Sequence, residues 1–183
     1  MTTEHDNLVQ RQFGATAADY VTSAVHASGT DLRRIAQIAA DCAPRRALDL
    51  GCGGGHVSYA VAPHSRELIA CDLSSEMLAA VQAEASRRAI TNLTTVRAAA
   101  EALPFADAEF DFLACRFSTH HWGHAQAGLN EARRVLRPGA TAVFVDVIAP
   151  ALAAADTHLQ AVEVLRDPSH GRDYSIACHS ALL

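Results

Sequence analysis

The stretch ALDLGCGGGH, residues 47–56, contains the strongest structural signal in this chain. An apolar run with a single acid, Asp49, is followed by four glycines within five residues. Glycine adopts backbone conformations that other residues avoid, so this pattern predicts a strand that ends in a sharp turn. A plain tight turn needs only one or two glycines, and the surplus favours a loop that a ligand approaches closely.

Strand-like and helix-like segments alternate along the chain around this loop. Short apolar runs predict strands at 46–50, 67–73, 92–99, 111–117 and 141–149. Apolar residues at helical spacing predict helices at 8–28, 30–42, 56–64, 74–89, 125–136 and 157–166. Thr30 or Asp31 is expected to cap the helix at 30–42. Continuously apolar strands that alternate with helices predict an α/β fold, in which a doubly wound, mostly parallel sheet is covered on both faces.

The glycine loop follows the first strand of this series, and ligands of such sheets bind outside the carboxyl ends of the strands. The spacing differs from the dinucleotide fingerprint G-x-G-x-x-G because His56 occupies the third glycine position. A Walker A loop is excluded, since no Gly-Lys-Ser/Thr follows. Asp72, at the end of the second strand, is suited to accept hydrogen bonds from ribose hydroxyls. Alternatively, Asp72 or Ser74 caps the next helix, and both roles are compatible.

Four segments together resemble class I S-adenosylmethionine-dependent methyltransferases of type 11, related to the ubiquinone/menaquinone biosynthesis C-methyltransferases. They are LDLGCGGGH (48–56), ACDLSSEML (70–78), AAAEALPFADAEFDFLACRFSTHHW (98–122) and EARRVLRPGATAVFVDV (131–147). The resemblance implies a Rossmann-like sheet of strand order 3-2-1-4-5, S-adenosylmethionine as the cofactor and a small-molecule acceptor. It also implies that residues 1–183 form one domain. A helical lid is expected at 1–44, the cofactor-binding core at 45–148, and a last helix with an irregular tail at 149–183.

The resemblance further implies which residues contact the cofactor. Asp49 would lie near the methionine amino group and order the loop, in which Gly51, Cys52 and Gly53 bring the backbone close to the methionine half. Asp72 would bind the ribose hydroxyls.

The adenine and the sulfonium are expected to have their own contacts. Leu73 and Met77 would lie against the adenine, and the loop Ala99-Ala100-Glu101 would reach its edge. Many relatives carry Asp at position 99, so here the adenine contacts are expected from the backbone or from Glu101. Arg116 would lie over the methionine carboxylate or the acceptor entrance. Tyr20 is a lid residue over the sulfonium or a plain packing residue.

Two histidines, His120 and His121, follow the fourth strand and are candidate catalytic residues. Methyl transfer mainly requires alignment of nucleophile and methyl group. A general base helps only when the acceptor is a poorly ionised hydroxyl or carbon acid. The alternative is that one histidine packs under the lid and the other lies at the surface. A metal site with His124 is not predicted, because no acidic or cysteine partner has suitable spacing.

Composition excludes several other classes of protein. The net charge is −5 and the chain has no Lys, which argues against nucleic-acid binding. No apolar run is long enough for a membrane span, and the polar N-terminus resembles no signal peptide. The five cysteines form no C-x-x-C pair, as is typical of reduced thiols in the cytoplasm.

Relatives of this branch continue beyond the last helix with two more strands, so the resemblance indicates a C-terminally truncated member. The strand at 141–149 would then form a sheet edge, through which two copies are expected to pair as a homodimer. Two alternatives to methyl transfer stay open at this point. One is a non-catalytic S-adenosylmethionine-binding protein, and the other, which His56 disfavours, is a nicotinamide-dependent oxidoreductase.

Overall fold

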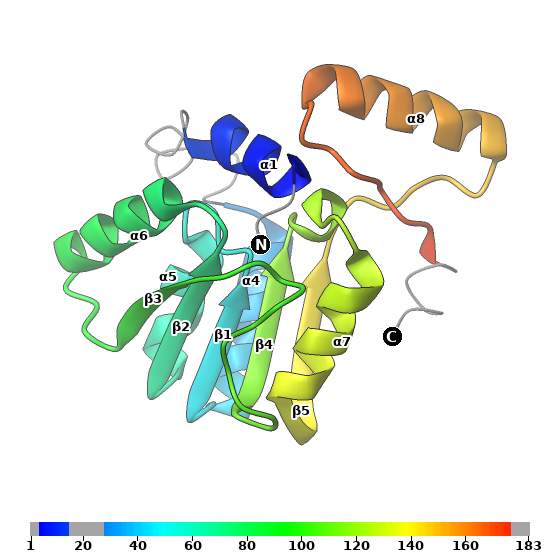
Figure 1. Ribbon diagram of the computed structural model, residues 1–183. Helices are drawn as coiled ribbons and strands as arrows, with labels where there is room; N and C mark the ends of the chain where they lie inside the picture. The colour runs from blue at the N-terminus through cyan, green and yellow to red at the C-terminus, as the bar shows by residue number, and fades with distance from the viewer. Residues whose placement is uncertain (1–3, 15–27, 177–183) are drawn as a thin grey trace.

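A parallel sheet of five strands forms the centre of the computed structural model, which describes residues 4–14 and 28–176 (Figure 1). The strands are β1 (Arg46–Leu50), β2 (Glu67–Asp72), β3 (Leu93–Arg97), β4 (Phe110–Arg116) and β5 (Leu136–Val145). They lie in the order β3-β2-β1-β4-β5, and all neighbouring pairs are parallel. The predicted fold class and strand order are confirmed.

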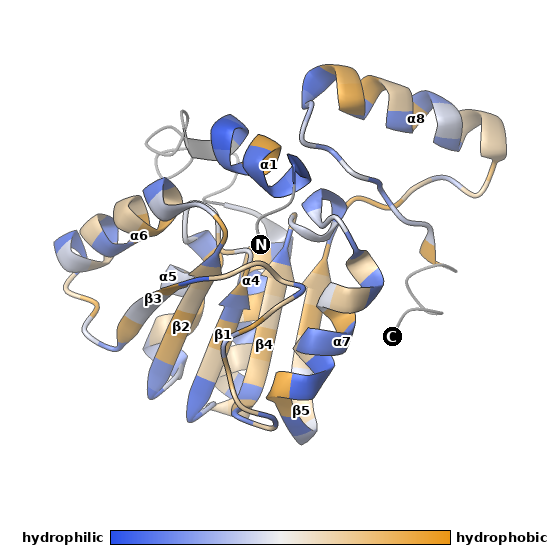
Figure 2. Cartoon of the chain, viewed as in Figure 1, coloured by the Kyte–Doolittle hydropathy of each residue, from blue (hydrophilic) through white to orange (hydrophobic). Residues whose placement is uncertain are grey.

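Helices and a loop cover the two faces of this sheet. The helices are α4 (Thr30–Cys42), α5 (His56–Val61), α6 (Ser75–Arg87) and α7 (Ala125–Val135), with short 3-10 turns η1 (Ala62–His64) and η2 (Thr119–His121). Phe112 of β4 belongs to a core with α4, α5 and α6, whereas its neighbour Leu113 belongs to a second core with α7 and the loop after β3. Figure 2 shows the apolar character of the strands between these layers. Both sheet faces are therefore buried, as continuously apolar strands require.

The predicted bounds of the fifth strand and of the last helix are wrong. The fifth strand begins at Leu136 instead of residue 141, because Leu136 still pairs with Phe110 before the register shifts and regular pairing resumes at Thr141. It ends at Val145, and Asp146 turns toward η2. The last helix, α8 (Ala153–Arg166), begins four residues before the predicted start because the Ala-rich stretch joins it.

The N-terminal region also differs from the prediction. Helix α1 (Glu4–Gly14) replaces the start of the helix expected at 8–28, and residues 15–27, with Tyr20, lie outside the described part of the chain. Helix α4 has Gly29 at its N-cap and no side-chain cap. Asp31 instead accepts a hydrogen bond from Arg116, so the predicted cap at Thr30 or Asp31 is wrong. Ser74 does cap α6, as its side chain accepts from the backbone N–H of Met77.

Helix α1 lies over the carboxyl ends of the strands, and α8 lies at the same end of the sheet (Figure 1). None of the residues of α8 is buried. No helix in residues 4–14 and 28–176 is long and apolar enough to cross a membrane. The assignment of 1–44 as a lid and 149–183 as a tail stays a prediction.

Strand β5 forms one edge of the described sheet, and pairing of two copies along it stays a proposal. We expect light scattering coupled to gel filtration to give twice the mass of one chain. Ala142→Lys should return the monomer mass, because a charge on an exposed edge residue opposes strand pairing. The matched control is Ala83→Lys on the exposed side of α6, which should leave the mass unchanged. A wild-type monomer at micromolar concentration would contradict the proposal.

Candidate functional site

A cavity of about 330 Å³ opens at the carboxyl ends of the strands. Its walls come from the glycine loop after β1, the end of β2, the loop after β3 and the end of β4 with η2. Residues of α1 and of the C-terminal end of α8 also line it. The sequence placed a ligand site at this end of the sheet, and the cavity lies there.

The glycine loop owes its path to left-handed backbone conformations. Gly51 has a φ of 71° and Gly53 a φ of 48°, a region that strongly favours glycine. The N–H groups of Gly51 and Cys52 both donate to the carbonyl oxygen of Cys71, at 2.8 and 3.0 Å. A side chain on Gly51 would overlap Ser118, whereas one on Gly53 would meet no protein atom within 4 Å. Gly53 therefore leaves open space above the loop for a ligand.

Asp49 is the buried acid in β1, and its side chain borders the cavity. Only 1% of the residue is exposed, and Ser58 donates a hydrogen bond to Oδ2 at 2.5 Å. Burial raises the pKa of Asp49 to about 7, and the nearby Asp72 adds to this effect. A cationic group beside this buried carboxyl would stabilise its ionised form and lower its pKa.

Asp72 connects the glycine loop to the start of α6. Its Oδ2 accepts from the N–H of Gly53 at 2.8 Å, and its Oδ1 accepts from the N–H of Ser74 at 2.9 Å. Burial raises the pKa of this carboxyl. Each carboxylate oxygen can accept a second hydrogen bond, so Asp72 keeps acceptor capacity toward the cavity.

The other candidate cofactor residues in the described ranges border the same cavity. They are Cys52, Leu73, Met77, Ala99, Ala100, Glu101 and Arg116, together with Gly51, Gly53 and the two acids described above. Tyr20 lies outside the described residues.

Two of these side chains have partners that the sequence did not indicate. Oε1 of Glu101 accepts a hydrogen bond from the backbone N–H of His124 at 3.1 Å. This part of its hydrogen-bonding capacity is therefore used within the protein and not for a ligand. Nε of Arg116 donates to Asp31 at 2.5 Å, and the guanidinium lies 4.5 Å from the ring of Phe117. This ion pair ties the start of α4 to the end of β4.

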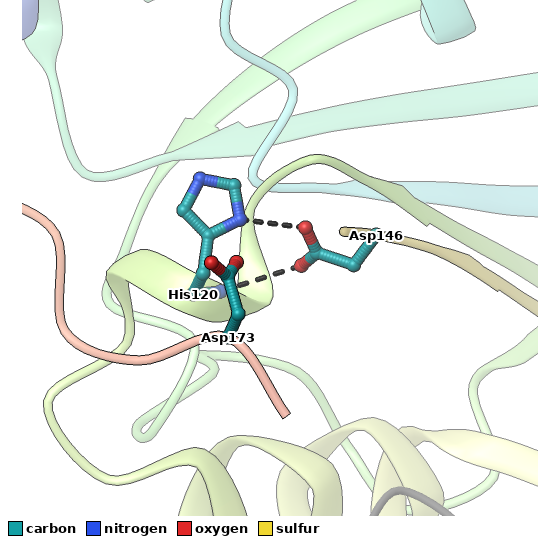
Figure 3. A group of neighbouring side chains, drawn as sticks. All are labelled: His120, Asp146 and Asp173. Atoms are coloured by element: carbon teal, nitrogen blue, oxygen red, sulfur yellow. Dashed lines mark hydrogen bonds and ion pairs between the residues drawn. The ribbon is translucent and has the colours of Figure 1, made fainter. Parts of the chain in front are cut away.

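Both candidate histidines border the cavity, and both are largely buried, so the alternative that placed one of them at the surface is wrong. Nδ1 of His120 lies 2.6 Å from Oδ1 of Asp146 (Figure 3). Nδ1 of His121 lies 3.2 Å from the carbonyl oxygen of Ser169, and its ring centroid is 4.1 Å from that of His120. Burial and the neighbouring His120 lower the pKa of His121 to about 4.

Acidic partners missed in the sequence surround His120. Asp146 directly follows β5, and Asp72 is the last residue of β2, so both acids lie at the carboxyl end of a strand. This similarity was the signal available in the sequence. Asp173 comes from the segment after α8, whose Gly171 N–H donates to the carbonyl oxygen of His120 at 2.7 Å. A ring nitrogen of His120 and carboxylate oxygens of Asp146 and Asp173 lie within 4.8 Å of one another. Asp146 and Asp173 are distant in the chain, so the sequence spacing around His120 did not reveal them, and His124 does not belong to this group. That the protein has no metal site stays a prediction.

Comparisons with known proteins agree with the fold and the position of the cavity. A family described as "Methyltransferase domain" matches residues 48–144. The uncharacterized methyltransferase YcgJ of Bacillus subtilis is 33% identical over 165 residues, which are 90% of this chain and 65% of YcgJ. Its crystal structure gives a TM-score of 0.80, covering 83% of this chain and 65% of that one.

Two further relatives match over shorter shares of their length. The uncharacterized protein YafE of Escherichia coli is 41% identical over 68% of this chain and 60% of its own length. The ubiquinone/menaquinone biosynthesis C-methyltransferase UbiE of Rubrivivax gelatinosus is 30% identical over 81% of this chain and 59% of its own. The chain thus spans less than two thirds of the length of each of these three relatives.

Proposed function

Because the chain belongs to the methyltransferase domain family, we propose that it binds S-adenosylmethionine in this cavity and methylates a small-molecule acceptor. The observation that carries the proposal is the convergence of Asp49, the open glycine loop and Asp72 on one cavity. Solved structures of the same fold include S-adenosylmethionine-dependent methyltransferases from Aquifex aeolicus and Mesorhizobium loti.

The residues present fit this cofactor in charge and shape. Asp49 is suited to the methionine amino group, since a cation beside a buried acid favours its ionised form. Asp72 has the acceptor capacity for the ribose hydroxyls. Leu73 and Met77 offer apolar contacts for the adenine. When bound, the cofactor supplies an activated methyl group on a sulfonium.

The remaining wall of the cavity, with Arg116, His120 and His121, would contact the acceptor. These groups come from the end of β4 and from η2, whereas Asp72 ends β2, and β1 lies between these two strands. Their role would be to orient the acceptor toward the methyl group and to exclude water.

The nicotinamide alternative has less support. In a dinucleotide site the pyrophosphate lies at the N-terminus of the helix that follows the glycine loop. Here that position is occupied by the buried His56, the first residue of the six-residue α5. A side chain of this size opposes the close approach that the third glycine of the fingerprint permits.

We expect calorimetric titration to show micromolar binding of S-adenosylmethionine and S-adenosylhomocysteine. Asp72→Ala should weaken the binding of both compounds by at least about 100-fold. The substitution removes two acceptors for the ribose hydroxyls and the acceptor of the Gly53 N–H. Each hydrogen bond to a charged group contributes about 1.5–3 kcal/mol. Asp41→Ala, which removes an exposed acid from α4, is the matched control and should bind normally. NAD should not bind.

A second experiment tests the acceptor class. The purified chain is incubated with methyl-labelled S-adenosylmethionine and cell extract, and the label is followed by size fractionation. Label in the low-molecular-mass fraction is expected. Label in protein or nucleic acid would contradict the small-molecule proposal, and cofactor binding without any transfer would favour the non-catalytic alternative.

A further inference from the structure

The geometry points to His120 and Asp146 as a general-base pair for the acceptor, which makes the acceptor a weak acid with a phenolic or enolic hydroxyl. This inference rests on the proposed function and names its substrate class. Four hydrogen-bond donors fix Asp146, one of them being Nδ1 of His120 at 2.6 Å.

The contacts of Asp146 determine which nitrogen of His120 carries the proton. The carboxylate also accepts from the Thr119 hydroxyl and from the N–H groups of His120 and Val147, the last at 2.8 Å. A carboxylate that is surrounded by donors is stabilised in its ionised form. Nδ1 of His120 must then be the donor in the 2.6 Å contact, so the neutral ring has its lone pair on Nε2.

Nε2 of His120 is in a position to accept a proton from a ligand. It points away from Asp146 (Figure 3), and no residue in the described ranges hydrogen-bonds to it. The side chain keeps 10% of its surface exposed, and the residue borders the cavity that also contains the glycine loop and Asp72. A ligand in the cavity is therefore the available partner for Nε2.

The electrostatic surroundings favour proton uptake by His120 over uptake by His121. Burial opposes a charged ring, yet the hydrogen bond to Asp146 raises the pKa of His120 above its ordinary value. Asp173 and Asp167, from the segment after α8, act in the same direction. His121 has the lowered pKa described above and donates from Nδ1 to the carbonyl oxygen of Ser169. The ring of His170, 5.6 Å from that of His120, completes the surrounding groups.

The presence of a base limits the acceptor chemistry. A neutral amine is already nucleophilic and needs no base before attack, whereas a phenol or an enol is mostly protonated at neutral pH and gains reactivity from proton removal. In the reaction, Nε2 takes the hydroxyl proton. The electron pair left on the acceptor forms a bond to the methyl carbon from that oxygen or, in an enol, from its conjugated carbon. The carbon–sulfur bond breaks at the same time, and its electron pair stays on the sulfur.

The test uses 4-nitrophenol as a probe, because its absorbance reports directly whether it is ionised. It is titrated with pH in the presence of the full chain saturated with S-adenosylhomocysteine. We expect the bound probe to ionise about one to three pH units below the free probe, since its anion lies beside the imidazolium. His120→Gln and Asp146→Asn should abolish this shift, while His124→Gln, which changes an exposed histidine of the same loop, should keep it.

A second measurement separates positioning from plain structural damage. Nitrogen NMR of labelled histidine should show the His120 proton on Nδ1 in the wild type and a mixture of tautomers in Asp146→Asn. Absence of probe binding, or an unshifted bound probe in the wild type, would overturn the inference even when S-adenosylhomocysteine binds normally. Micromolar Zn²⁺ binding that Asp173→Asn abolishes would overturn it too, by making the three side chains metal ligands. Failure to bind S-adenosylhomocysteine would instead refute the proposed function.

Discussion

Gly51→Ala should destabilise the free protein by about 3 kcal/mol. Two effects combine at this position. A left-handed backbone costs a non-glycine residue about 1–2 kcal/mol, and the new Cβ would overlap Oγ of Ser118 and lie 2.6 Å from its Cβ. Overpacking of this kind adds about 1–3 kcal/mol. Urea unfolding followed by circular dichroism measures the difference.

Gly53→Ala is the matched control for this substitution. Gly53 has a φ of 48°, but its added Cβ would meet nothing within 4 Å, so only the conformational cost of about 1–2 kcal/mol remains. In a Ser118→Gly background, the cost of Gly51→Ala should fall to that of Gly53→Ala, because the overlapping side chain is gone. Equal costs in the wild-type background would show that the contact with Ser118 is unimportant.

The affinity for S-adenosylmethionine should fall roughly twentyfold between pH 7.5 and pH 5.5, because Asp49 takes up a proton in this range. Burial raises the pKa of Asp49 to about 7 in the free protein. The cationic amino group of the ligand favours the ionised carboxylate, so binding below pH 7 must also release a proton. Calorimetric titration at a series of pH values measures the slope.

Two variants check that Asp49 is the group responsible. Asp49→Asn should bind weakly and with little dependence on pH. Ser58→Ala should move the midpoint to higher pH, because the hydrogen bond from Ser58 lowers the pKa of Asp49 and its loss leaves burial unopposed. A wild-type affinity that does not change between pH 5.5 and 7.5 would contradict the assignment.

The same pKa has a consequence for the stability of the free protein. Because the folded-state pKa lies above the ordinary value of 3.8, the contribution of Asp49 is fully present below that value and is lost as pH rises toward 7. The free wild type should therefore lose stability over this range relative to Asp49→Asn, and bound cofactor should reduce the loss.

The glycine loop, Asp49 and Asp72 were predictable because their signals are local. Each lies within or directly after one strand, and the carboxyl ends of parallel strands meet at the same edge of the sheet. The strand order came from the resemblance of the motifs, and the structure confirms it. Because both sheet faces are apolar, successive residues of β4 belong to the two cores in turn, and most residues of β1 and β4 are buried.

Other features depend on contacts between residues far apart in the chain. Asp31 has the residue type and position of a helix cap. Its carboxylate instead accepts a hydrogen bond from Arg116, which is 85 residues away in the chain. The fifth strand extends back to Leu136 because Phe110 of β4 pairs with it, although the sequence placed Leu136 at the end of the helix at 125–136. The intrinsic secondary-structure preference of a short segment contributes little when a neighbouring strand supplies hydrogen bonds and burial.

The sequence by itself determined the α/β fold, the position of the ligand site and about half of the residues that line the cavity. Only the tertiary structure brought Asp146 to within 2.6 Å of His120 and folded the segment with Asp173 against η2. Strand periodicity and glycine turns are properties of short stretches, which the amino-acid order specifies directly. The partners of a buried histidine depend on how the ends of β4, β5 and α8 pack together, and no local pattern contains that packing.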